Sequence, residues 1–190
     1  MEKVTHKTQT LVGKGLRTQW KEREMILDSK FQDSHKIAVE YSTLAAREQN
    51  DCVVRAFMAV LDVSYDAAHG WVKKYLGRKF GRGTYTSATI ESVLGKVKNG
   101  YKLSAYGCHP DKKWIMGPKG FRTITNPRYK NKKVGYTLKS FMEAHPKGRY
   151  FVILERHAVA VVNGVLYGNK CEQRQALYRR VNWVVKCEEK

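Results

Sequence analysis

The clearest hydrophobic pattern in the chain begins just after Asp51. Apolar residues recur there at the three- and four-residue intervals of one helix face, at Val53, Ala56, Phe57, Val60 and Leu61. Asn50 and Asp51 precede the pattern, and both residue types commonly cap helices. The sequence therefore predicts a buried helix with Cys52 in its first turn.

Three more segments show helical spacing. They run from Ser64 or Asp66 to Leu76, from Thr86 or Ser87 to Val97, and from Thr137 to Met142. Ser, Thr and Asp at the start of each are N-cap residues. Gly77 follows the first of them, and glycine often ends a helix in the left-handed conformation.

The last third of the chain has the pattern of strands. Residues 150–154 are continuously apolar, Glu155 and Arg156 interrupt them, and a second apolar run begins at His157. Asn163-Gly164 predicts a two-residue hairpin turn, because both turn positions need a positive φ. A return strand reaches Tyr167, and another is expected at residues 181–185. Helices followed by an antiparallel sheet indicate an α+β domain.

The chain of 190 residues divides by composition into two parts. Residues 1–47 are basic with scattered apolar positions and are expected to form an extension. Residues 48–190 hold the periodic patterns and are expected to form the compact domain. Inside it, residues 109–135 lack periodicity, and so long a loop is usually functional or disordered.

Charge suggests a polyanionic partner. The chain has 36 Lys and Arg against 17 Asp and Glu, a net charge of +19, and residues 109–135 carry +7 of it. Basic residues interleaved with aromatic ones suit binding to the backbone and bases of RNA or DNA. The alternative is a solvated insertion whose aromatic side chains attach it to the core. The candidate nucleic-acid-binding residues are Lys112, Lys113, Trp114, Lys119, Arg122, Arg128, Tyr129, Lys130, Lys132 and Lys133.

The cysteines favour a reducing compartment and free thiols. They are widely scattered and show no paired metal-ligand spacing, and Cys108-His109 stands alone. We expect no metal and no cofactor. No apolar stretch approaches the length of a membrane span, and the amino terminus lacks the apolar core of a signal peptide. These features predict a soluble, cytoplasmic protein without a membrane partner.

Cys52 and His157 are candidates for nucleophilic chemistry. A helix start favours the thiolate form of cysteine, which is the nucleophile. A histidine at the start of a later strand can be brought beside it and act as its base. Taken singly, Cys52 also fits a small buried hydrophobic residue, and His157 fits a histidine at a strand end.

This order of elements resembles the papain-like cysteine peptidases. The motifs Asn50-Asp51-Cys52-Val53-Val54-Arg55-Ala56 and His157-Ala158-Val159-Ala160-Val161, with His145-Pro146-Lys147-Gly148-Arg149-Tyr150, are similar to small proteins of tailed bacteriophages and bacteria of the bacteriocin-leader-peptidase-like group. The resemblance covers roughly residues 48–170. It implies a papain-like fold, Cys52 as nucleophile, His157 as general base, a peptide or protein substrate, and a phage protein acting in the host cytoplasm.

Two positions depart from the papain-like pattern. The oxyanion-hole glutamine expected six residues before the cysteine is replaced by Ala46, so Gln49 becomes the candidate, beside the backbone N–H of Cys52. The Asn163-Gly164 turn pairs residue 168 with 159, on the face of His157, and that residue is Gly168, where similar phage proteins tend to have Asp. Asn169, one residue later, faces the other way unless a bulge at Gly168 turns it, and it is the candidate to orient the histidine.

The other polar candidates have simpler interpretations. His6, His35, His69 and His109 are expected at the surface, and His145 at a helix carboxyl end. Arg55 is expected to pair with Asp51 or Asp62 in a structural role.

These observations leave three hypotheses open. The first is a cysteine hydrolase that cleaves a peptide or isopeptide bond through a thioester, or performs the related acyl transfer or deamidation. The second is a weak or inactive papain-like fold that binds RNA or DNA through residues 109–135. The third combines them, with charge steering a hydrolase to a target bound to nucleic acid.

Overall fold

The fold is α+β, as the sequence predicts. The computed structural model describes residues 30–84, 92–106, 136–170, 173 and 175–190, and the backbone of 112–117 and 120–125. Within these residues, no helix is both long and apolar enough to cross a bilayer. The compact unit spans Gln32–Lys190.

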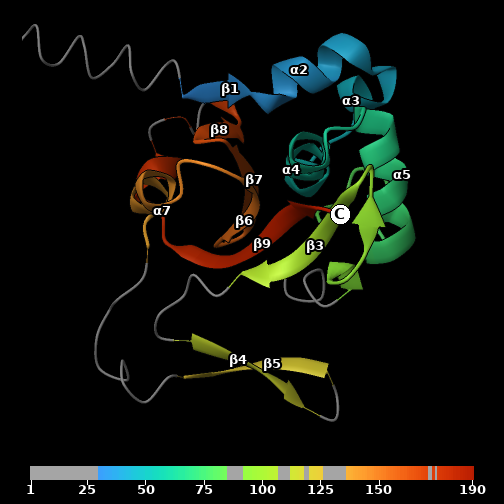
Figure 1. The fold of residues 1–190 in the computed structure, drawn as a ribbon. Helices are drawn as coiled ribbons and strands as arrows, with labels where there is room; N and C mark the ends of the chain where they lie inside the picture. The colour runs from blue at the N-terminus through green and yellow to red at the C-terminus, as the bar shows by residue number, and fades with distance from the viewer. Residues whose placement is uncertain are drawn as a thin grey trace, which may run out of the picture. The chain divides into compact units, whose positions relative to one another are not determined.

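A seven-stranded sheet forms the centre of this unit (Figure 1). Its central pairs are antiparallel, and β6 lies between β7 and β9. In spatial order the strands are β1 (Phe31–Asp33), β8 (Val165–Gly168), β7 (His157–Val162), β6 (Arg149–Leu154), β9 (Val181–Glu189), β3 (Tyr101–Tyr106) and β2 (Val97–Lys98).

One face of the sheet is covered by α4 (Cys52–Leu61), and α5 (Tyr65–Leu76) packs against α4. Phe57 of α4 stacks on Phe151 of β6 with ring centroids 4.3 Å apart, and Trp71 of α5 lies 5.0 Å from Phe57. Phe57 and Phe151 are fully buried. The apolar face that the helical spacing predicted is therefore the face that holds α4 on the sheet.

The helix α7 (Leu138–Ala144) lies against the opposite face of the sheet, and the short 3-10 helix η3 (Ala176–Tyr178) contacts α7. Phe141 of α7 lies 5.3 Å from Tyr150, the neighbour of Phe151 on β6. Because successive strand residues point to opposite faces, β6 buries side chains on both sides. This explains why residues 150–154 are continuously apolar instead of alternating with polar residues.

Several local predictions are confirmed. Asn163 and Gly164 have φ of 50° and 77°, and the turn pairs Ala160 with Tyr167, in the predicted register. Thr137 caps α7 in a capping box with Ser140, and His145 ends that helix. Ser64 caps α5, and Gly77 ends it in the left-handed conformation. The strand predicted at 181–185 is present and extends to Glu189.

The compact unit begins before position 48, where the sequence boundary was drawn. Residues of the expected extension form β1, α2 (Ser34–Tyr41) and α3 (Thr43–Arg47). Asp33 and Ser42 cap the two helices. Ala38 and Ala45 are each 1% exposed, and Ile37 and Leu44 pack against the same core. These few apolar contacts are spread over two short helices, so the composition of the segment suggested an extension.

The expectation of an irregular segment at 109–135 is wrong for part of it. β4 (Lys112–Gly117) and β5 (Gly120–Thr125) pair as an antiparallel hairpin, a separate two-stranded sheet. The helix predicted up to Val97 is also wrong at its end, because Gly95 has a φ of 76° and Val97 belongs to β2. Positions 86–91 of that predicted helix lie outside the described residues. The strand β3 was not predicted.

Candidate active site

The candidate nucleophile is the first residue of α4. Asp51 occupies the N-cap position, as predicted, but its side chain makes no capping hydrogen bond. Asn50, the residue before it, has a φ of 53°, in the left-handed region that Asn tolerates better than most residues. Cys52 therefore lies at the end of α4 where backbone N–H groups favour a negative charge.

The carboxylate of Asp51 is held by two side chains from the helices instead. Arg55 donates from Nε to Oδ1 at 2.8 Å, one turn along α4. Tyr65 of α5 donates from its hydroxyl to Oδ2 at 2.9 Å. Asp51 and Arg55 are 3% and 6% exposed, so this ion pair is buried. Of the two partners expected for Arg55, the structure selects Asp51.

The structure brings Cys52 and His157 together. Burial acts to raise the pKa of the Cys52 thiol, but a hydrogen bond to the His157 side chain, the charge of that imidazole, the backbone N–H of Ala158 and the charge of Arg55 together lower the pKa below its ordinary value. His157 opens β7, and Ala158 follows it. The start of one helix and the start of one strand thus supply a thiol with a base and a backbone donor.

Cys187 provides a contrast inside the same protein. It is also a free cysteine, buried in β9. Burial raises the pKa of its thiol to about 12, and the charge of Arg149 offsets this only in part. Burial alone therefore does not explain the lowered pKa of Cys52. The neighbouring imidazole and N–H group distinguish this thiol from that of Cys187.

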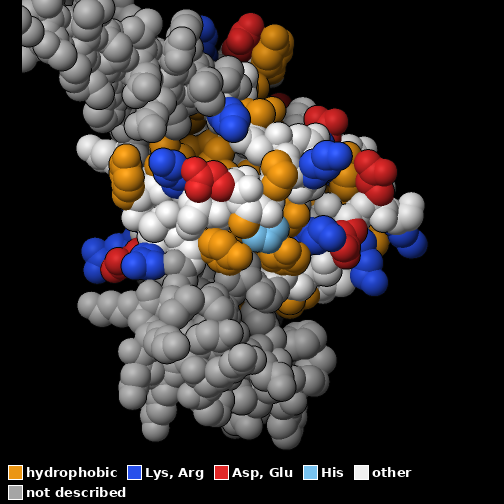
Figure 2. All heavy atoms as spheres, turned by 60° about the vertical axis from the view of Figure 1, so that its left-hand side comes forward, with side chains coloured by type: hydrophobic (Ala, Val, Ile, Leu, Met, Phe, Trp, Pro, Cys, Tyr) orange, Lys and Arg blue, Asp and Glu red, His pale blue; other side chains and the backbone are white. Residues whose placement is uncertain are grey.

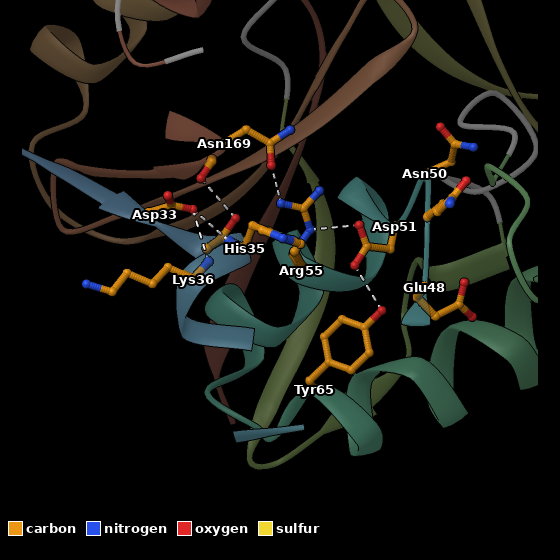
Figure 3. Close-up of polar contacts among 12 residues, drawn as sticks. Asp33, His35, Lys36, Glu48, Asn50, Asp51, Arg55, Tyr65 and Asn169 are labelled. Carbon is orange, nitrogen blue, oxygen red and sulfur yellow. Dashed lines mark hydrogen bonds and ion pairs between the residues drawn. The ribbon is translucent and has the colours of Figure 1, made fainter. Parts of the chain in front are cut away.

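Asn169, the candidate orienting residue, follows directly after β8. Its Oδ1 accepts a hydrogen bond from Nη1 of Arg55 (Figure 3). Continuing the pairing of Ala160 with Tyr167 by two residues places Asn169 opposite Ala158. Asn169 therefore lies beside the start of β7 and points toward Arg55 of α4. Its role in orienting His157 stays a prediction.

Gln49, the candidate oxyanion donor, is an exposed residue between α3 and α4. Its backbone carbonyl accepts a hydrogen bond from Nη2 of Arg78 at 3.1 Å. The chain leading to Cys52 is thus held by Arg78, while the oxyanion role of the Gln49 side chain stays a prediction. The backbone N–H groups at the start of α4 are the other donors at this end of the helix.

A second buried charge cluster lies just before the site and was not predicted. Glu48 lies 2.9 Å from Nη2 of Arg78 and 2.7 Å from Nε2 of His69, and it accepts from the N–H of Gly81 at 2.9 Å. The surface location expected for His69 is wrong, because its side chain is 13% exposed and lies against Glu48. These residues are far apart in sequence and share no motif, so no pattern in the sequence indicated that they would be in contact.

The nucleic-acid-binding candidates are only partly covered by the structure. Lys112, Lys113 and Trp114 belong to β4 and Arg122 to β5, where the backbone alone is described. The remaining candidates, at 119 and 128–133, lie outside the described residues. On the face shown in Figure 2, acidic side chains are interspersed with basic ones among the described residues. The prediction that the protein binds RNA or DNA therefore still rests on the sequence.

The described residues hold no cluster of three or more His, Cys, Asp or Glu side chains that could bind a metal. No protein-family model, curated protein or solved structure matches this chain.

A thiol with a lowered pKa, beside an imidazole and at a helix start, is the arrangement from which nucleophilic attack on a carbonyl proceeds.

Proposed function

We propose that this protein is a papain-like cysteine hydrolase that cleaves an amide bond, in a peptide or isopeptide, through a thioester on Cys52. The observation that carries the proposal is the position of the half-buried Cys52 thiol at the start of α4, in hydrogen-bond contact with the His157 side chain and the N–H of Ala158, which act to lower its pKa. Cys187, which is buried in β9, has the opposite pKa shift. Perturbed ionisation with a specific charge partner is typical of functional sites.

In the proposed reaction, the Cys52 thiolate attacks the carbonyl carbon of the amide. The S–C bond forms as the carbonyl π electrons move to oxygen, and N–H groups at the start of α4 stabilise the resulting oxyanion. The protonated His157 imidazole gives its proton to the amide nitrogen, and the C–N bond breaks to release an amine. A thioester between Cys52 and the acyl group remains.

The second half of the reaction determines the product. Water, deprotonated by His157, attacks the thioester carbonyl, and loss of the Cys52 thiolate yields a carboxylic acid. An amine in place of water gives acyl transfer, and a glutamine side chain as the substrate gives deamidation. All three reactions use the same two residues, so the first test concerns the nucleophile pair and the second concerns the substrate.

The test of the nucleophile pair is the rate of iodoacetamide alkylation as a function of pH, read by peptide mass spectrometry. An ordinary cysteine has a pKa of about 8.5, whereas a histidine-paired thiolate reacts at lower pH. We expect Cys52 to be alkylated at mildly acidic pH in the wild type and slowly in His157→Ala. Cys187 is the internal control and is expected to stay unmodified in both proteins.

The test of hydrolysis uses a library of fluorogenic peptide amides. We expect the wild type to cleave members of the library and Cys52→Ala and His157→Ala to cleave none. An ordinary pH profile of Cys52 alkylation that His157→Ala leaves unchanged, with no cleavage of the library, would overturn the proposed function.

A further inference from the structure

Arg55 joins two elements that meet at the candidate site. It lies on α4, three residues after Cys52, and is 6% exposed. Its Nε donates to Asp51 at the start of the same helix, and its Nη1 donates to Asn169 at the end of β8. Figure 3 shows the guanidinium between these two residues, which point toward it from opposite sides.

The acidic end of this network is fixed from a third element. Tyr65 of α5 donates to the second oxygen of Asp51 at 2.9 Å. Burial and the nearby charge of Asp51 raise the pKa of Tyr65, so its hydroxyl stays protonated and remains a donor. The carboxylate of Asp51 is therefore bound on both oxygens. This fixed carboxylate restricts the orientation of the planar Arg55 guanidinium that pairs with it.

Asp51 and Asn169, the two hydrogen-bond partners of Arg55, each lie next to a residue of the Cys52 site. Asp51 directly precedes Cys52, and Asn169 lies opposite Ala158 when the β7–β8 register is continued. Ala158 is the residue whose N–H contacts the sulfur, and His157 adjoins it. Each end of the network is thus next to a residue that forms the sulfur site.

A buried ion pair could instead serve stability alone. Such pairs often contribute little net stability, because desolvation of the two charges offsets their attraction. Arg55 does more than pair with Asp51, since one of its donors reaches across to Asn169, which follows β8. Its charge also acts on the Cys52 thiol, in the same direction as the charge of His157.

We propose that Arg55 is a positioning residue, whose guanidinium fixes the start of α4 against the β7–β8 pair and so keeps the Cys52 sulfur in contact with His157 and Ala158. This inference rests on the proposed function, because it concerns the same nucleophile. The charged and titratable side chains it involves are His157 from β7, Asp51 and Arg55 from the start of α4, and Tyr65 from α5.

Two variants separate the roles of Arg55. Arg55→Lys keeps the positive charge but has one ammonium group in place of a planar fork, so it does not hold both partners in the same geometry. The double variant Asp51→Asn with Arg55→Met removes the network without leaving a buried unpaired carboxylate. Its new amide can still accept a hydrogen bond from Tyr65.

A matched control lies at the other end of α4. Arg149 donates to the carbonyls of Val60 and Ala59, each at 2.7 Å, and so binds the carboxyl end of the same helix. Arg149→Lys makes the same chemical change far from Cys52 along α4. It is expected to alter thermal stability without altering the ionisation of the Cys52 thiol.

The experiment measures Cys52 alkylation by iodoacetamide from about pH 5 to about pH 9 in wild type, both Arg55 variants and Arg149→Lys. Thermal unfolding of each protein is recorded alongside. We expect the pKa of the thiol to rise by about one unit in both Arg55 variants, which lowers the alkylation rate below that pKa about tenfold. Arg149→Lys is expected to keep the wild-type profile.

The results distinguish this inference from the proposed function. Folded Arg55→Lys with the wild-type pH profile would overturn the positioning role, while the function stands on the wild type. An ordinary thiol profile in the wild type itself would overturn the proposed function, and the inference with it. If Arg55→Lys does not fold, a wild-type profile in the double variant overturns the positioning role, because that variant also removes the bridge between Asp51 and Asn169.

Discussion

The buried cluster around Arg78 leads to the largest stability effect that we expect. Arg78 and Glu48 have side chains with zero exposed fraction, and Nη2 lies 2.9 Å from Oε2. Replacing Arg78 with Met leaves a buried carboxylate without its cation, and such a change costs about 3–5 kcal/mol of unfolding free energy. Nη1 also donates to the carbonyls of Asn50 and Arg82, at 3.2 and 2.8 Å, so two loops lose a common partner.

The same cluster predicts strong energetic coupling between Glu48 and Arg78. Nε of Arg78 is buried and has no hydrogen-bond partner among the described residues, so part of the cost of burying this side chain is uncompensated. Removing both charges, in Glu48→Gln with Arg78→Met, also removes that cost. We expect the double variant to be more stable than the sum of the single effects predicts, by about 1–3 kcal/mol.

Urea unfolding followed by circular dichroism measures these free energies. Lys139→Met is the control, because Lys139 and Glu143 form an exposed pair at 3.9 Å, and such pairs contribute about 0–1 kcal/mol. A loss below about 1 kcal/mol in Arg78→Met would refute the reasoning, since that is the range of solvated pairs. So would a loss that disappears in about 1 M salt, because buried pairs are screened much less than exposed ones.

Two further predictions concern acid stability and nucleic acid. Burial opposes the ionisation of Glu48, but the backbone N–H of Gly81 and the side chains of His69 and Arg78 lower its pKa below the ordinary 4.5. The contribution of Glu48 to stability is therefore present above pH 4.5 and is lost as the pH falls through the lowered pKa. Urea midpoints against pH should fall less steeply in Glu48→Gln, and parallel curves would contradict this. The charge of residues 128–133 predicts salt-sensitive binding of single-stranded RNA or DNA. Replacing Lys130, Lys132 and Lys133 with Gln should reduce the slope of log K against log salt by about 2, and an unchanged slope would exclude these lysines from binding.

Elements with strong local signals could be predicted from the sequence. Thr137, Gly77 and the Asn163-Gly164 turn act through their own backbone or that of residues within a few positions. The turn also determined the register of β7 and β8, so the location of Asn169 beside the start of β7 followed from it. These features depend on short-range geometry, which sequence patterns record directly.

Elements held by long-range contacts could not be predicted in this way. β1 belongs to the sheet although it has three residues, and Ser34 donates to the carbonyl of Gly168 at 3.1 Å, across most of the chain. Likewise, Arg55 contacts Asn169 from 114 positions away. The pairing of Cys52 with His157 was predicted from residue chemistry and element order, whereas the network that surrounds it required the structure.

The missing side-chain cap on α4 is best understood together with Arg55. A capping carboxylate would neutralise the positive end of the helix and place a negative charge beside the Cys52 sulfur, both of which oppose a thiolate. In this structure Arg55 neutralises Asp51 within a buried pair. The first-turn N–H groups are therefore not occupied by the Asp51 carboxylate. The helix forgoes about 1 kcal/mol of capping energy, and its positive end stays available to an anionic sulfur or a developing oxyanion, which is what the proposed reaction requires.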